Sequence, residues 1–166
     1  EFDASPPEGI IIDLRNNPGG FLTTAVQIAG FFIKSGETVA VIRYPTRKEN
    51  QISTGSGELA RFKKIAVIVN EGSASASEIL AGALQDYSIA KIVGDKSFGK
   101  GTVQEIAEFP DGSTLKLTVA EWLTPKERLI ESNGIMPDYG ITLTDEDRKA
   151  SRDPQLDRAL EELRKM

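Results

Sequence analysis

The chain has 166 residues and a formal net charge of −5, and it contains no histidine and no cysteine. Its length fits a single domain with a real hydrophobic core. The acidic balance argues against a nucleic-acid-binding face, and no apolar run is long enough to span a membrane. The missing residue types exclude a Ser-His-Asp triad, thiolate chemistry, disulfides and histidine-ligated zinc. Acid-base chemistry therefore falls to Lys, Asp, Glu or Tyr.

The first residues are expected to lie at the border of a longer protein. The stretch EFDASPPEG (1–9) has the pattern of the tail of a helix followed by a Pro-rich turn, and no signal peptide is visible. We therefore expect 1–166 to be one domain excised from a longer chain.

The first half of the chain alternates predicted strands with one helix. The apolar run IIIDLR (10–15) is typical of a strand buried on both faces, and TVAVIRY (38–44) predicts the next strand. Between them, 21–33 predicts a helix that stops at Gly36. Its apolar positions at helical spacing are Leu22, Val26, Ala29 and Ile33. A polar segment at 46–60 predicts a mobile loop near a functional site.

The middle of the chain predicts two more buried strands, a helix and a hairpin. The strands are expected at 63–70 and 90–95, and the helix between them at 75–87. The runs 102–109 and 114–124 flank the turn sequence PDGS and predict the hairpin. Because strands alternate with helices, we expect a mainly parallel sheet with sites at the carboxyl ends of its strands.

The last element is predicted to be an amphipathic helix at 153–166. Asp153 is its expected N-cap and Pro154 its first residue. Its predicted buried stripe consists of Leu156, Leu160 and Leu163.

Three serines stand where the helix at 75–87 is expected to begin. In the sequence NEGSASASEI (70–79), Ser75 with Glu78 matches a capping box, so one interpretation is that Ser75 only caps the helix. The other is that Ser75 is a nucleophile. Free backbone N–H groups at a helix start could then stabilise an oxyanion.

The stretch GDKSFGKGTV (94–103) partly matches two known motifs, the phosphate loop and the Ser-x-x-Lys motif. Lys100 completes G-x-x-x-x-G-K of a phosphate loop, but Gly101 stands where Ser or Thr is required. Ser97 with Lys100 matches Ser-x-x-Lys of penicillin-binding enzymes. Both motifs need a helix here, whereas the following residues are β-branched and strand-like.

A third interpretation makes Lys100 a general base. A lysine between glycines and after Phe98 could lie against apolar surface, where burial favours the neutral amine. A neutral amine can take the proton from a serine hydroxyl. The alternative is an ordinary exposed loop lysine.

Four stretches together resemble the catalytic core of the carboxyl-terminal processing proteases, or tail-specific proteases. These stretches are DLRNNPGG (13–20), VNEGSASASEILAGALQD (69–86), VGDKSFGKGTVQ (93–104) and NGIMPD (133–138). The resemblance implies an α/β spiral core related to the Clp protease and crotonase folds. It implies a Ser–Lys serine endopeptidase that cleaves near protein C-termini through an acyl-enzyme, with no metal and no cofactor.

The resemblance also implies roles for individual residues. Ser75 would be the nucleophile, Lys100 the general base and then the general acid, and Gln104 the residue that orients the lysine amine. The backbone N–H groups of Gly20 and Ala76 would form the oxyanion hole. Glycine at 20 would let the backbone approach the substrate carbonyl. Ser73 and Ser77 are then expected to be caps or packing residues.

The same resemblance implies partners and context. Members act outside the cytoplasm on C-terminal tails of proteins, bound as an added strand, and usually carry a PDZ domain, whose sequence is not found here. It implies no nucleic acid and no integral membrane segment, and it allows an oligomer. The alternatives are a non-catalytic ligand-binding homologue and a nucleotide binder with a phosphate loop.

Overall fold

Two four-stranded sheets, with helices between and beneath them, make up the described part of the chain. The structure is a computed structural model that describes residues 7–165. The predicted helix tail at the N-terminus falls mainly on residues 1–6, which lie outside the described residues, as does Met166. No helix within 7–165 combines the length and the apolar character that a membrane crossing requires.

The first sheet is parallel and central. Its strands are β1 (Ile10–Asp13), β4 (Ile65–Val69), β5 (Lys91–Gly94) and β8 (Tyr139–Gly140). They run in the order β1-β4-β5-β8, and every neighbouring pair is parallel. All five residues of β4 are buried, as expected for a β-branched run covered on both faces. The predicted strands at 10–15, 63–70 and 90–95 are confirmed, but β1 is only half-buried rather than buried on both faces, because it lies at the edge of the sheet.

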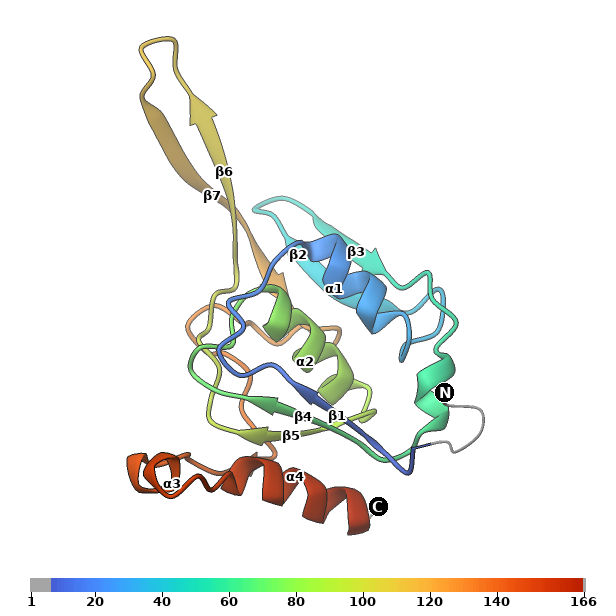
Figure 1. Cartoon of the computed structure of the whole chain (residues 1–166). Coiled ribbons are helices and arrows are strands. Elements are labelled where there is room, and N and C mark those ends of the chain that lie inside the picture. The colour runs from blue at the N-terminus through green and yellow to red at the C-terminus, as the bar shows by residue number, and fades with distance from the viewer. Residues whose placement is uncertain (1–6, 166) are drawn as a thin grey trace.

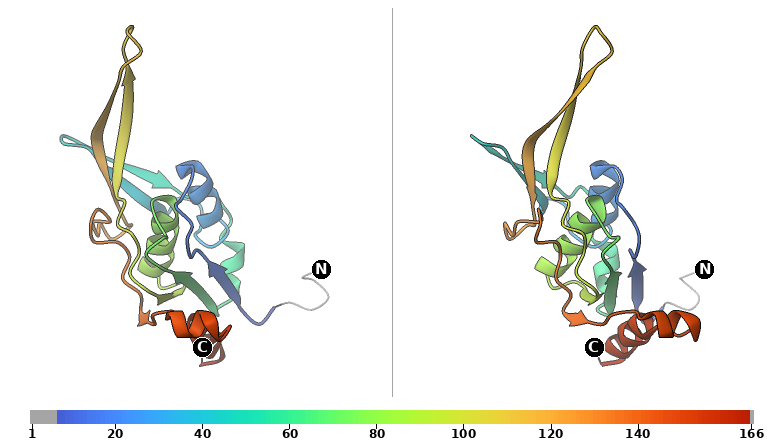
Figure 2. Two further views of the ribbon diagram at one scale, coloured as in Figure 1. Left: turned by 60° about the vertical axis from the view of Figure 1, so that its left-hand side comes forward. Right: turned by 90° about the vertical axis from the view of Figure 1, so that its left-hand side faces the viewer.

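The second sheet is antiparallel and carries the predicted hairpin. Its strands are β2 (Thr38–Arg43), β3 (Lys48–Ile52), β6 (Thr102–Glu108) and β7 (Thr114–Leu123), in the order β3-β2-β7-β6. The β6–β7 hairpin projects far from the body of the molecule in every view (Figures 1 and 2).

The prediction of a mobile loop at 46–60 is wrong. This segment holds β3, which pairs with β2 after a short turn, and the 3-10 helix Glu58–Arg61. The residues of β3 are KENQI, an unusually polar strand. Polar and charged side chains are common on edge strands, because they discourage pairing with other chains, and this hid the strand in the sequence.

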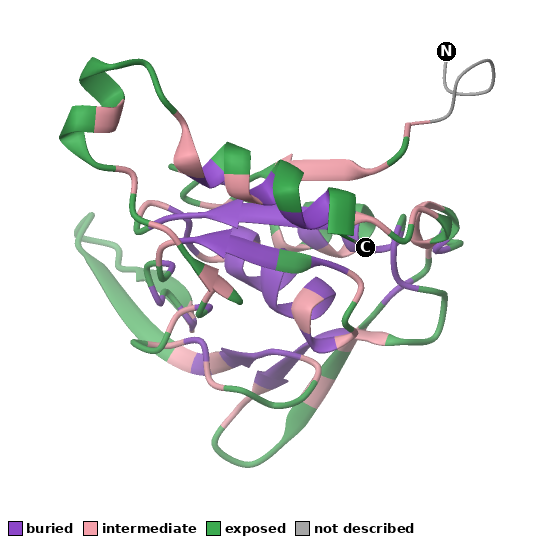
Figure 3. Ribbon diagram, turned by 90° about the horizontal axis from the view of Figure 1, so that it is seen from below, coloured by how far each residue is buried: buried purple, intermediate pink, exposed green. Residues whose placement is uncertain are grey.

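Helices separate the two sheets and cover the outer face of the parallel one. The helices α1 (Leu22–Ala29) and α2 (Ala76–Asp86) lie between the sheets, whereas α3 (Asp145–Lys149) and α4 (Pro154–Lys165) lie below the parallel sheet (Figure 1). Seen from below, β4 and most of β5 are buried behind α4, whereas β1 is only half-buried and the distal hairpin is exposed (Figure 3). Helices thus cover both faces of the parallel sheet, and the loops that follow its strands lie at the carboxyl ends of the strands.

The helix predicted at 21–33 is shorter than expected. It ends at Ala29 rather than near Gly36. The Gly30 carbonyl accepts a hydrogen bond from Gly57 N–H at 2.9 Å, and the next carbonyl accepts from Leu59 N–H at 2.7 Å. Residues 57–59 therefore bond to the carbonyl groups that would otherwise continue the helix. This tertiary contact cannot be read from the spacing of apolar residues.

The buried face of α4 also differs from the prediction. Leu156 and Leu160 are 36% and 39% exposed, and only Leu163 of the predicted stripe is buried. Ala159 lies at the centre of the contact, in a cluster with residues of β4 and β5. A small alanine lets the helix approach the sheet closely, which leaves the two leucines at the margin of the contact. The predicted N-cap is confirmed, because Asp153 Oδ1 accepts the Leu156 N–H at 3.0 Å.

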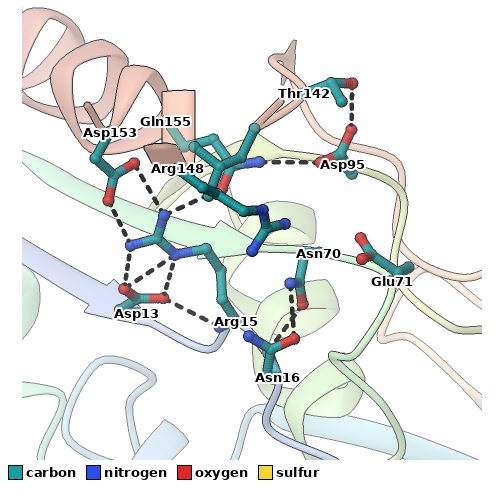
Figure 4. Close-up of a pocket in the computed structure, with 11 residues that line it drawn as sticks. Asp13, Arg15, Asn16, Asn70, Glu71, Asp95, Thr142, Arg148, Asp153 and Gln155 are labelled. Carbon is teal, nitrogen blue, oxygen red and sulfur yellow. Dashed lines mark hydrogen bonds and ion pairs between the residues drawn. The ribbon is translucent and has the colours of Figure 1, made fainter. Parts of the chain in front are cut away.

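Arg15 joins the end of β1 to the start of α4 (Figure 4). Its guanidinium donates to both oxygens of Asp13, to Asp153 and to the Gln155 side chain at 2.6–3.2 Å. These bonds use all five of its N–H donors. The guanidinium also lowers the pKa of the Asp153 carboxyl below its ordinary value.

The Arg15 contact predicts how stability depends on pH. Asp153→Asn keeps a good N-cap but removes the charge that faces Arg15, so we expect the free energy of unfolding to fall by about 1 kcal/mol at pH 7. A carboxyl whose folded-state pKa is lowered stabilises fully above its unfolded pKa. This contribution is lost as the pH falls through the folded-state pKa, below about 4. The difference between wild type and variant should therefore shrink in acid.

Urea denaturation from pH 7 down to pH 2 measures this difference. Asp157→Asn, at an exposed position one turn along α4, is the control and should change little. An Asp153→Asn deficit that stays constant down to pH 2 would contradict the assigned role of the Arg15 contact.

Candidate active site

The loops that follow β1, β4 and β5 meet at one edge of the parallel sheet. They carry Gly20, Ser75 and Lys100 respectively. Carboxyl ends of parallel strands share an edge, and ligand sites of α/β proteins lie there. The expectation that a site lies at the carboxyl ends of the parallel strands is supported by this topology.

Ser75 stands at the N-cap of α2 in a strained conformation. Its φ of 57° and ψ of −116° are uncommon for a residue with a Cβ and cost roughly 1–3 kcal/mol. Ser75 and Glu78 form a capping box, in which the Ser75 N–H donates to Glu78 Oε2 at 2.8 Å and the Ser75 side chain faces the Glu78 backbone N–H without a formed hydrogen bond. The Glu78 N–H donates instead to the Ser75 carbonyl at 2.9 Å, so the capping box leaves the Ser75 hydroxyl without a formed hydrogen bond.

The neighbouring serines are buried and bonded to the backbone, as predicted. The Ser73 hydroxyl donates to the Leu14 carbonyl at 2.7 Å, and the Ser77 hydroxyl donates to the Asn17 carbonyl at 3.1 Å. These bonds attach the loop after β4 to the loop after β1. Ser75 is thus the serine of the three whose hydroxyl has no hydrogen bond within residues 7–165.

Lys100 is close to this site through its backbone, but its side chain is exposed. Its N–H donates to Glu78 Oε2 at 2.9 Å, the same oxygen that accepts from Ser75. The Lys100 side chain does not lie against apolar surface as expected, because Phe98 is itself 66% exposed. In the described part of the chain its amine forms no hydrogen bond to Ser75 or to Gln104. Gln104 is exposed on β6 and lines the same cavity as Ser75.

Two backbone N–H groups beside Ser75 are available to a ligand. Among residues 7–165, the N–H groups of Gly20 and Ala76 donate no hydrogen bond, and both residues line two cavities that Phe21 also lines. The glycine whose missing Cβ brings the two loops together is Gly19 rather than Gly20. A Cβ on Gly19 would lie 2.7 Å from the Ala74 carbonyl oxygen, whereas a Cβ on Gly20 would meet nothing within 4 Å.

The cavity beside Ser75 is mainly apolar. It has a volume of about 260 Å³ and is lined by Gly20, Phe21, Leu22, Ser75, Ala76, Ile79, Thr102, Val103, Gln104 and Trp122. A larger polar cavity of about 630 Å³ surrounds Arg15 (Figure 4). The donors of Arg15 are all used within the protein, so Arg15 offers none to a ligand in that cavity.

Glu78 is the site residue whose importance sequence reasoning missed. It was interpreted only as the capping-box partner of Ser75, yet its side chain is 0% exposed and accepts bonds from both loops. The available signal was its position: an acidic residue directly before Ile79 and Leu80, on a helix that is buried on almost every side.

The two helix-dependent motifs are not formed. The phosphate-loop pattern and the Ser-x-x-Lys pattern both require a helix at Lys100, but the loop there leads into strand β6. Gly99 and Gly101 instead contact the segment 130–134, where a Cβ on either would collide with backbone atoms. The nucleotide-binding alternative therefore loses its structural basis.

The chain belongs to peptidase family S41. The sequence model of this family, described as Peptidase family S41, matches residues 1–141. The chain is 50% identical over 135 residues to a probable CtpA-like serine protease of Staphylococcus epidermidis, which covers 80% of this chain and 27% of that protein. It is 50% identical over 133 residues to a probable CtpA-like serine protease of Staphylococcus aureus, with the same coverage. The chain thus spans about a quarter of the length of the curated relatives it matches.

Solved structures agree on the fold. The photosystem II D1 C-terminal processing protease superposes with a TM-score of 0.75 at 32% identity, over 85% of this chain and 36% of that one. A putative peptidase from Parabacteroides merdae superposes with a TM-score of 0.80 at 22% identity, over 95% and 52% of the two chains. The predicted α/β fold class and the family resemblance are confirmed.

The glycine contact yields a prediction on stability. Gly19→Ala should lower the free energy of unfolding by about 1–3 kcal/mol, because its φ of 100° and the nearby Ala74–Ala76 backbone both oppose a side chain. Gly20→Ala is the matched control and should cost nothing, because its Cβ would enter open space. Chemical denaturation compares the two. Equal losses would mean that the close approach of the loops does not depend on Gly19.

Proposed function

We propose that residues 1–166 act as the catalytic core of a serine endopeptidase with Ser75 as nucleophile and Lys100 as general base. The observation that carries the proposal is the strained Ser75 with its unbonded hydroxyl, beside two free N–H groups and next to the loop of Lys100. With no histidine in the chain, lysine is the residue at this edge whose neutral form can accept the serine proton.

The proposed reaction proceeds through an acyl-enzyme. Ser75 Oγ attacks the scissile carbonyl carbon while its proton passes to the neutral Lys100 amine. The N–H groups of Gly20 and Ala76 donate to the oxyanion, the peptide C–N bond breaks, and the lysine ammonium protonates the leaving amine. Water then hydrolyses the acyl ester by the same route. Gln104 would orient the lysine amine.

The proposed substrates are C-terminal tails of proteins located outside the cytoplasm. Strand β6 is an edge of its sheet and leads directly from the Lys100 loop, so an extended peptide could pair with its free side. The peptide would cover Lys100 and remove water from its amine, which favours the neutral form. The apolar cavity beside Ser75 fits a small or medium apolar side chain next to the scissile bond.

One observation favours a second candidate, a non-catalytic ligand-binding homologue. The Lys100 side chain is exposed and makes no bond to Ser75 in the described residues. In that case the cavity would hold an apolar ligand, and neither Ser75 nor Lys100 would be needed. The two substitutions below distinguish the candidates.

Ser75→Ala should abolish peptide hydrolysis in the natural full-length chain and leave the fold intact. Alanine also carries a Cβ, so the backbone strain stays, and the hydroxyl makes no formed capping hydrogen bond; we expect the unfolding midpoint to change little. Ser77→Ala is the matched control. It should keep activity and lose about 1 kcal/mol of stability, since it loses the bond to the Asn17 carbonyl. Hydrolysis retained in Ser75→Ala would exclude Ser75 as the nucleophile.

Lys100→Arg should be as inactive as Lys100→Ala. A guanidinium keeps the positive charge but stays protonated and has no lone pair to offer. The control is Lys96→Arg, at an exposed lysine of the same loop whose amine donates to the Ser132 carbonyl at 3.1 Å. The wild-type rate should rise with pH along a single limb, since the chain holds no imidazole. Substantial turnover by Lys100→Arg would refute the Ser–Lys mechanism.

A further inference from the structure

The Glu78 carboxylate is a buried anion held only by hydrogen bonds to neutral groups. Its side chain is 0% exposed, and within residues 7–165 it forms no ion pair. Four donors reach it: Ser75 N–H at 2.8 Å, Lys100 N–H at 2.9 Å, Gly99 N–H at 2.7 Å and the Ser97 hydroxyl at 2.6 Å. A carboxylate has about four acceptor sites, so its capacity is used in full.

One oxygen of this carboxylate joins the two proposed catalytic residues. Oε2 accepts from both Ser75 N–H and Lys100 N–H. The two backbone nitrogens can therefore be no further apart than the sum of those two bonds. Because Glu78 lies in the first turn of α2, the same contact fixes both loops to the helix and opposes relaxation of the strained Ser75 backbone.

The other oxygen extends the contact to a third segment. Oε1 accepts from Gly99 N–H and from the Ser97 hydroxyl, which in turn accepts the Ile135 N–H at 2.6 Å. Ser97 is 3% exposed, so this chain of bonds is closed to water. It gives a physical role to the NGIMPD stretch (133–138), which carries no proposed catalytic group.

The chemistry requires a carboxylate at this position. Glutamine has the same shape but only one acceptor oxygen, so its amide NH₂ would face either the N–H groups of Ser75 and Lys100 or the Gly99 N–H together with the Ser97 hydroxyl. An unsatisfied buried donor is costly, and the loops would separate to relieve the contact. Small displacements of a nucleophile from its base are known to reduce rates strongly.

We propose that Glu78 is a positioning residue that sets the spacing of the nucleophile and general-base loops, and that Ser97 and the backbone of Ile135 hold its carboxylate in place. This inference rests on the proposed Ser75–Lys100 function. In addition, one buried carboxylate, that of Glu78, fixes the distance between the Ser75 loop and the Lys100 loop.

The test compares Glu78→Gln with Glu162→Gln in the natural full-length chain. Glu162 is also a buried glutamate, but its side-chain partners Arg158, Lys165 and Tyr139 lie on α4 and β8, away from the site. For Glu78→Gln we expect kcat for a peptide substrate to fall roughly 10- to 100-fold, with KM within about twofold. We expect Glu162→Gln to lower the unfolding midpoint and leave kcat unchanged.

Two further measurements keep the test decisive. Ser97→Ala is the fallback variant if Glu78→Gln does not fold. It retains the carboxylate but removes one of its four donors, so we expect a smaller, severalfold fall in kcat. Amide proton NMR shifts of Ser75, Gly99 and Lys100 report the bonds directly and should move upfield together in Glu78→Gln, whether or not the protein hydrolyses peptides.

The outcomes separate the two proposals. An active Ser75→Ala protein would refute the proposed function. An inactive Ser75→Ala protein combined with unchanged kcat in folded Glu78→Gln, or in Ser97→Ala, would overturn the positioning role alone. Failure of both network variants to fold would also overturn it, because Glu78 would then support the fold rather than the site.

Discussion

The packing of three parallel strands between two layers of helices is the constraint on which the site depends. Strands β1, β4 and β5 lie between α4 on one side and α1 and α2 on the other, so their carboxyl ends open to one shared edge. Each of their connections must therefore start at that edge. The glycine loop, the Ser75 turn and the Lys100 loop are neighbours in space because their strands are neighbours in the sheet, although they are far apart in the sequence.

Within this site the backbone is fixed more firmly than the side chains. Hydrogen bonds to Glu78 hold the amides of Ser75 and Lys100, and close contact with Gly19 holds the serine turn against the loop after β1. By contrast, the side chains of Lys100 and Gln104 are exposed. A bound peptide can therefore complete the site by covering the lysine amine, without rearranging the loops that carry the catalytic residues.

Features that depend on local sequence patterns could be predicted from the sequence, whereas features that depend on tertiary contacts were missed. Buried β-branched runs revealed β4 and β5, and the family resemblance singled out Ser75 among three similar serines. The polar strand β3 was missed because an edge strand needs little apolar character. The face of α4 was mispredicted because Ala159, not the leucines, sets its distance to the sheet. The role of Glu78 required knowing that residues 97–100 fold back onto α2.

The most direct test of the central claim is covalent labelling of the natural full-length protein with a fluorophosphonate probe, followed by peptide mapping by mass spectrometry. Such probes react with activated serine hydroxyls and do not depend on the identity of the substrate. The account predicts a single adduct on Ser75, which is lost in Lys100→Arg although Ser75 is still present. An adduct on Ser73 or Ser77, or undiminished labelling of Ser75 in Lys100→Arg, would contradict a nucleophile activated by Lys100.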